Sequence, residues 1–206
     1  MNKIRVAIIE DETMVAQMLA TWLEHTGEFT VLGRAATGAE GWELCTRCSP
    51  EVVLLDVELS GTDGLELAGR LKRSLPHTKI IVVSGREDPY MLYRMHQLDL
   101  SGYVSKGISI GTLREAILAV AQGQRFYSEP FARLLAAEDA FFRVLTTREV
   151  EVLYAATQGL AWGAIARKLQ IASGTVQKHF FNMRRKLGLH NRTELLLYAT
   201  RIGMDL

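Results

Sequence analysis

Short apolar runs alternate with helix-like segments through the first 122 residues of this 206-residue chain. Two of the runs, Val52–Leu55 and Ile80–Val83, are apolar at every position. Continuous apolar runs are typical of strands whose two faces are both covered, as in a parallel sheet flanked by helices. Parallel strands need long, usually helical, connections between them. The alternation of strand-like and helix-like segments is therefore compatible with only a few folds.

Five repeats of a strand followed by a helix predict a doubly wound, flavodoxin-like α/β domain with five parallel strands. The expected strands cover residues 4–9, 30–36, 51–56, 79–84 and 101–104. The expected helices cover residues 13–25, 39–48, 63–74, 89–97 and 109–122. We therefore place the first domain at residues 1–122.

Polar residues directly follow four of the expected strands. Glu10 and Asp11 follow the first strand, Asp56 the third, Ser84 the fourth and Lys106 the fifth. The carboxyl ends of parallel strands meet at one edge of the sheet, so these side chains should share a pocket there. Carboxylates grouped with a hydroxyl and an ammonium suit Mg²⁺ and a phosphoryl group.

The predicted pocket assigns a role to each residue. Asp56 is the expected nucleophile, because it sits centrally and carboxylates form acyl phosphates. Asp11 and Asp56 should bind Mg²⁺ directly, and Glu10 through a water molecule. Lys106 would offset charge on the transferred group, and Ser84 would donate a hydrogen bond to it.

The two parts of the chain carry opposite net charge. Residues 1–141 hold 14 Lys and Arg against 19 Asp and Glu, whereas residues 142–206 hold 10 against 4. Such an asymmetry suggests an acidic domain joined to one that binds a polyanion.

From Leu145 onward the sequence predicts helices only, at 147–158, 162–168, 173–187 and up to about residue 202. Thr146 and Glu149 form a capping box at the first of them, and Ser173 is expected to cap the third. Two short helices joined by a tight turn, the second one basic, predict a helix-turn-helix. We place this all-α, four-helix domain at residues 143–206, after a linker at 123–142 with a connecting helix at 131–140.

The helix at 173–187 is the candidate for reading DNA. Val176, Phe180, Met183 and Leu187 recur at spacings of four, three and four residues, which predicts a buried stripe. The remaining positions face outward and are candidates for DNA contact in the major groove. They are Thr175, Gln177, Lys178, Phe181, Asn182 and Arg185.

Together these residues resemble a known family. Glu10-Asp11, Asp56, Asp63-Gly64, Ser84, Tyr103 and Lys106 are similar to the receiver domain of two-component response regulators. The C-terminal part, with Leu145-Thr146, Arg148-Glu149, Gly159-Leu160, Thr175-Val176, His179 and Arg185-Lys186-Leu187-Gly188, resembles the LuxR/FixJ (NarL) type of helix-turn-helix. The two resemblances cover nearly the whole chain.

The resemblance implies that a sensor histidine kinase transfers a phosphoryl group to Asp56 with Mg²⁺. It also implies that Ser84 and Tyr103 reorient together, and that a homodimer then binds double-stranded promoter DNA. We further expect the backbone of Glu58 to be a metal ligand.

Several positions depart from the family pattern. Glu10 replaces the usual Asp, and Ser60 stands where a Pro is common after the phosphoacceptor. Ala161 replaces a capping residue before the second C-terminal helix, at a cost of about 1 kcal/mol if nothing compensates. Phe181 is an apolar residue on the presumed DNA face.

Other classes of protein fit less well. No apolar stretch approaches the roughly 20 residues of a membrane span, so we expect a cytoplasmic protein with no membrane association. Cys45 and Cys48 lie in a helix-like segment without further metal ligands nearby, which favours ordinary packing. We expect a regulator rather than an enzyme. The alternatives are an atypical, phosphorylation-independent regulator and a Mg²⁺-dependent aspartyl-phosphate phosphatase, although the latter needs a second Asp where Glu58 stands.

Overall fold

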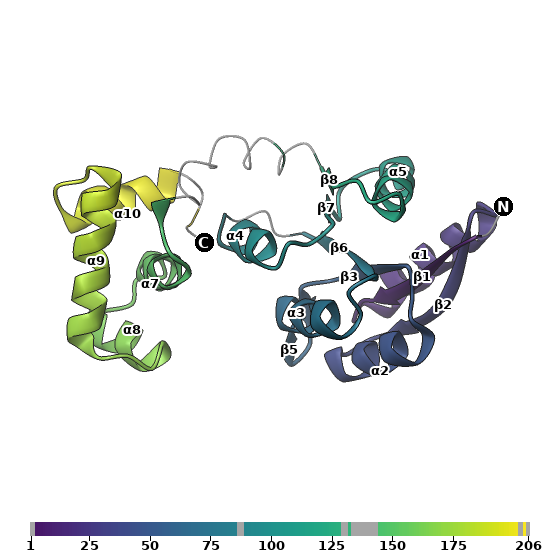
Figure 1. Ribbon diagram of the computed structural model, residues 1–206, viewed down its shortest axis with the longest axis horizontal. Helices are drawn as coiled ribbons and strands as arrows, with labels where there is room; N and C mark the ends of the chain where they lie inside the picture. The colour runs from purple at the N-terminus through teal and green to yellow at the C-terminus, as the bar shows by residue number, and fades with distance from the viewer. Residues whose placement is uncertain (1–2, 86–88, 129–131, 133–143, 202–203, 205–206) are drawn as a thin grey trace. The chain divides into compact units, whose positions relative to one another are not determined.

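The computed structural model describes residues 3–85, 89–128, 132, 144–201 and 204 (Figure 1). The chain forms two compact units. None of the helices within the described residues is long and apolar enough to cross a membrane.

A six-stranded parallel sheet forms the centre of the first unit, with the strand order β2-β1-β3-β6-β7-β8. The strands are β1 (Ile4–Ile9), β2 (Phe29–Ala35), β3 (Val52–Leu55), β6 (Lys79–Ser84), β7 (Gly102–Ser105) and β8 (Phe126–Tyr127). The alternating helices are α1 (Thr13–His25), α2 (Gly38–Cys48), α3 (Gly64–Ser74), α4 (Pro89–Gln97) and α5 (Ile110–Ala121). The predicted doubly wound α/β fold is confirmed, and the strand order reverses between β1 and β3.

Helices cover both faces of the central strands. On one face, Ile8 of β1 belongs to a core cluster with Leu23 of α1 and Ile117 of α5. On the other face, Ile9 is also fully buried, and a Cβ added to Gly41 of α2 would come within 2.8 Å of its side chain. Successive residues of a strand point to opposite faces. The continuous apolar runs are therefore explained by two cores, one on each side of the sheet.

Two features of the first unit were not predicted. The sheet has a sixth strand, because β8 pairs in parallel with β7, through Gly102–Phe126 and Tyr103–Tyr127. An antiparallel hairpin, β4 (Glu58–Leu59) with β5 (Thr62–Asp63), lies between β3 and α3. Each of these strands has only two residues, which is too short to give a periodic hydrophobic pattern.

The second unit is helical, with α7 (Thr147–Thr157), α8 (Trp162–Lys168), α9 (Ser173–Leu187) and α10 (Arg192–Arg201). The predicted capping box is present: the Thr146 side chain accepts from the backbone of Glu149, whose carboxylate accepts from the backbone of Thr146. The prediction that Ser173 caps α9 is wrong. Ala172 occupies the cap position, and no side chain accepts a hydrogen bond there. The expected connecting helix at 131–140 lies outside the described residues, apart from residue 132.

Candidate functional site

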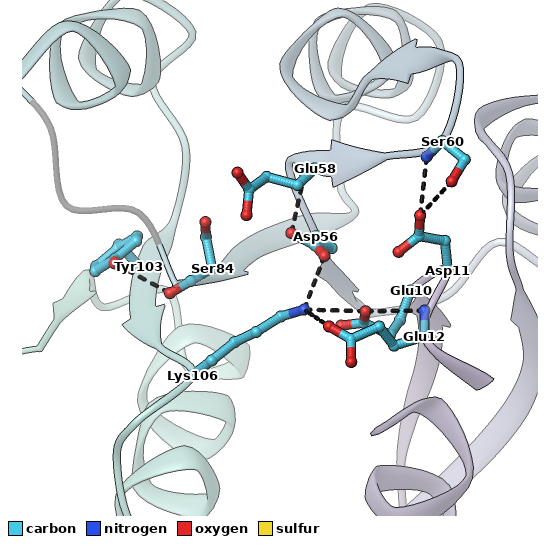
Figure 2. Close-up of polar contacts among 9 residues, drawn as sticks. All are labelled: Glu10, Asp11, Glu12, Asp56, Glu58, Ser60, Ser84, Tyr103 and Lys106. Carbon is cyan, nitrogen blue, oxygen red and sulfur yellow. Dashed lines mark hydrogen bonds and ion pairs between the residues drawn. The ribbon is translucent and has the colours of Figure 1, made fainter. Parts of the chain in front are cut away.

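Three carboxylates meet at the carboxyl ends of β1 and β3, where the strand order reverses (Figure 2). Glu10 and Asp11 follow β1, and Asp56 follows β3. One carboxylate oxygen from each of these three residues lies within 4.8 Å of one from each of the other two. Glu10 is 3% exposed and Asp56 is 2% exposed. Open α/β sheets bind their ligands at this reversal of strand order.

Lys106, which follows β7, brings a positive charge to these carboxylates. Its Nζ lies 2.9 Å from Asp56 Oδ2, 3.0 Å from Glu10 Oε1 and 3.4 Å from Glu12 Oε1 (Figure 2). Partial burial alone would lower the pKa of Lys106, but hydrogen bonds to Asp56 and Glu10 outweigh it and raise the pKa. The side chain is therefore an ammonium at any physiological pH.

Glu10 and Asp11, which follow β1, have opposite pKa shifts. Burial raises the pKa of Glu10, although the hydrogen bond from Lys106 opposes this effect. The hydrogen bond from the Ser60 side chain lowers the pKa of Asp11, so Asp11 is ionised across a wide pH range. Desolvation penalises a buried carboxylate, and a bound cation would relieve that penalty.

The backbone fixes Asp56 at its position. Its N–H donates to the Ile9 carbonyl at 2.9 Å, and the Glu58 N–H donates to Asp56 Oδ1 at 3.0 Å. A Cβ at position 64 would lie only 2.3 Å from the Asp56 carbonyl oxygen, so the glycine found there allows the chain to turn into α3. The contact with Glu58 uses its N–H, and metal binding by its backbone stays a prediction.

Ser84 and Tyr103 lie beside this pocket, and both are fully buried. Ser84 ends β6, and the Tyr103 hydroxyl donates to the Ser84 carbonyl oxygen at 3.2 Å (Figure 2). The backbone of Lys106 also donates to that carbonyl, at 3.0 Å. Three residues from two neighbouring strands are thus linked through one carbonyl group.

Two residues that contact the pocket had no role in the sequence-based prediction. Glu12 lies next to Lys106, and it could have been suspected from the acidic run Glu10-Asp11-Glu12. Ser60 hydrogen-bonds to Asp11 across 49 positions of sequence, and no local pattern indicates such a contact.

In the second unit, α9 has one buried and one exposed face. Val176, Phe180 and Met183 are at most 3% exposed, as the predicted stripe requires, whereas Leu187 is half-buried. The six residues predicted to face outward are exposed or half-buried: Thr175, Gln177, Lys178, Phe181, Asn182 and Arg185. Phe181, the apolar member of this set, is 56% exposed.

The basic residues of α9 divide into two groups. Lys186 Nζ lies 2.7 Å from Glu149 Oε2, and the Arg184 guanidinium donates to the His190 carbonyl, so both hold the unit together. Among the described residues, no ion pair involves Lys178 or Arg185. These two positive charges are exposed on the same outer face.

Two family models match the chain. One is described as the response regulator receiver domain and matches residues 6–118; the other is described as bacterial regulatory proteins, luxR family, and matches residues 143–199. The transcriptional regulatory protein LiaR of Bacillus subtilis is 32% identical over 205 residues, which covers 96% of this chain and 97% of LiaR. The response regulator GacA of Pseudomonas aeruginosa is 30% identical over 208 residues, with 98% and 97% covered.

Solved structures agree with this assignment. RcsB from Salmonella enterica serovar Typhimurium, bound to promoter P1flhDC in the presence of phosphomimetic BeF3-, has a TM-score of 0.69 and 28% identity, with 96% and 98% of the two chains covered. A structure of two RcsB dimers bound to two parallel DNAs has a TM-score of 0.67 and 28% identity, with 97% and 98% covered. The chain therefore belongs to the response regulators and is a DNA-binding transcription regulator, with a receiver domain followed by a luxR-family domain.

Proposed function

We propose that Asp56 accepts a phosphoryl group from a sensor histidine kinase and that this modification controls promoter binding. The observation that carries the proposal is the contact of a buried, backbone-fixed Asp56 with Lys106 and two further carboxylates. An Asp56 oxygen attacks the phosphorus, the bond from phosphorus to the donor nitrogen breaks, and an acyl phosphate forms on Asp56. Lys106 lies where its ammonium offsets charge on the transferred group.

Asp11 and Asp56 are the proposed direct ligands of Mg²⁺, with Glu10 acting through water and the backbone of Glu58 completing the set. Oxygen ligands grouped within 4.8 Å of one another fit this ion. When bound, Mg²⁺ supplies positive charge that stabilises the phosphoryl oxygens. Lys106 already occupies one side of the carboxylate group, which leaves the Asp11 side for the ion.

The readout of phosphorylation is proposed to pass through Ser84 and Tyr103. A phosphoryl group on Asp56 adds strong acceptor oxygens and up to about two negative charges. The Ser84 hydroxyl would turn toward it and vacate space. The Tyr103 side chain, whose hydroxyl donates to the Ser84 backbone carbonyl in this structure, would then fill that space. A local change of charge would thereby bias an element with two packing states.

The outer face of α9 is the proposed DNA-reading surface. Recognition helices of helix-turn-helix proteins lie in the major groove. Lys178 and Arg185 would contact phosphates, while Gln177 would reach base edges. Thr175 and Asn182 add further contacts. RcsB, which has a similar fold, is seen as dimers bound to DNA, and this supports a homodimer on promoter DNA for this chain. We place its action in the cytoplasm, as a regulator rather than as an enzyme.

A promoter-fragment binding experiment tests the proposal, with and without a small phosphodonor and Mg²⁺. Tighter binding only when both are present is the expected result. Unaltered binding would instead indicate a phosphorylation-independent regulator, and steady hydrolysis of a phosphoester would indicate a phosphatase.

A further inference from the structure

Ser60 makes two hydrogen bonds to one oxygen of Asp11. Its backbone N–H lies 3.0 Å from Asp11 Oδ2, and its hydroxyl lies 2.6 Å from the same atom (Figure 2). Both contacts have good hydrogen-bond distances, and the hydroxyl contact has the short length expected when the acceptor is ionised. The Asp11 carboxylate is therefore held from one side.

The turn that carries Ser60 is itself well defined. Ser60 and Gly61 connect β4 and β5, which pair through Glu58–Asp63 and Leu59–Thr62. Gly61 has a φ of 74°, a conformation that favours glycine. The hairpin thus presents the N–H and hydroxyl of Ser60 to the loop after β1. Both bonds go to Oδ2, so Asp11 Oδ1 is left out of this contact.

We propose that Ser60 is a positioning residue for the divalent cation, acting through Asp11. This inference rests on the proposed Mg²⁺ site. A carboxylate that is already oriented loses less rotational freedom when it binds the ion, so affinity rises. The same hydrogen bonds draw electron density from the carboxylate, which acts in the opposite direction. Hydrogen-bond partners of metal ligands typically raise metal affinity by 10- to 100-fold, so orientation is the larger effect.

Ser60 is exposed, so we expect an effect near the low end of that range. The experiment is a calorimetric titration of the full chain with Mg²⁺ alone. Ser60→Ala removes the hydroxyl but keeps the N–H, and its affinity should fall about tenfold. Ser60→Thr keeps both donors and should restore the original affinity. Ser74→Ala, at an exposed position near the end of α3, is the matched control and should leave the affinity unchanged.

Ser60→Pro separates the two hydrogen bonds, because proline lacks the N–H as well as the hydroxyl. Proline is compatible with a turn position that precedes a glycine of positive φ, so the hairpin should still form. The Mg²⁺ affinity of Ser60→Pro should be lower than that of Ser60→Ala. The circular dichroism spectrum of Ser60→Pro should match that of the unsubstituted chain. Equal or tighter Mg²⁺ binding by Ser60→Ala would overturn the role of Ser60. Absence of binding by the unsubstituted chain would overturn the Mg²⁺ site itself, and the role of Ser60 with it.

Discussion

The acidic pocket and the proposed DNA-reading surface of α9 are built in opposite ways. The pocket collects Glu10, Asp56 and Lys106 from three separate strand ends, and its two central carboxylates are at most 3% exposed. The reading surface comes from 15 consecutive residues of one helix, and its outer side chains face water, with Phe181 56% exposed. One site depends on long-range contacts, and the other on helical spacing.

This difference implies two kinds of sensitivity to substitution. Each pocket residue has a proposed role that its neighbours cannot replace, so single substitutions should abolish function. Each residue of the reading surface contributes a partial, additive contact, so substitutions should weaken binding in steps.

Asp56→Asn should abolish phosphoryl incorporation, because an amide oxygen is a poor nucleophile at this position. The measurement is the intact mass of the chain after incubation with a small phosphodonor and Mg²⁺. Asp63→Asn is the control: Asp63 caps α3 outside the carboxylate group, and Asn caps helices equally well, so incorporation should persist. Incorporation into Asp56→Asn would break the contrast between the two regions.

Lys178→Ala combined with Arg185→Ala should weaken DNA binding and lower its salt dependence by about two phosphate contacts. The binding constant is measured at a series of salt concentrations. The slope of its logarithm against the logarithm of the salt concentration gives the number of phosphate contacts. The control removes two exposed charges from the first unit, with Arg47→Ala and Arg73→Ala, and should leave the slope unchanged. If the slope of the Lys178 and Arg185 variant matched the original, the outer face of α9 would not lie along the DNA backbone.

Glu149→Gln should destabilise the chain by about 1–2 kcal/mol, because it removes a charged partner from Lys186 but keeps an acceptor for the cap. Burial alone would raise the pKa of Glu149, but the hydrogen bonds from Lys186 and Thr146 outweigh it and lower the pKa below that of an ordinary Glu side chain. A carboxylate whose pKa is lower in the folded state stabilises the fold at pH values above its pKa in the unfolded state. This contribution is lost as the pH falls through its pKa in the folded state.

Urea unfolding at neutral pH and at pH values below about 4.3, the ordinary pKa of a Glu side chain, tests this expectation. The difference in stability between the original chain and Glu149→Gln should shrink as the pH falls below that value. A constant difference at all pH values would show that the charge of Glu149 does not stabilise the helical unit.

Ala161→Ser should stabilise the chain by about 0.5–1 kcal/mol, since the cap position of α8 has no side-chain acceptor now. The urea midpoint of the substituted chain measures the effect. Ala172→Ser offers a second, independent test at the start of α9, where a side-chain acceptor is also absent. A lower urea midpoint for both variants would mean that the backbone N–H groups at these helix starts already have other hydrogen-bond acceptors.

The sequence was sufficient for features that follow from local patterns. The run Val52–Leu55 placed Asp56 at a strand end, and the parallel sheet then required its approach to Lys106. The stripe of Val176, Phe180 and Met183 oriented α9 in the same way. Helical and strand periodicity carry this information directly.

Other features depend on tertiary contacts that no local pattern encodes. The hydrogen bonds between Ser60 and Asp11 join residues 49 positions apart. The strand β8 forms because Phe126 and Tyr127 meet the edge of β7. Ser173 has the chemistry of a cap, yet the helix begins one residue earlier than that role requires, with Ala172 in the cap position.

In the proposed mechanism, modification of Asp56 changes the affinity of α9 for DNA. The most direct measurement is the dissociation constant of one promoter fragment for the original chain and for Asp56→Asn, each with and without phosphodonor and Mg²⁺. We expect the phosphodonor to tighten binding by the original chain and to leave binding by Asp56→Asn at its basal level. An equal gain in both proteins would contradict the claim, because the switch would then lie elsewhere.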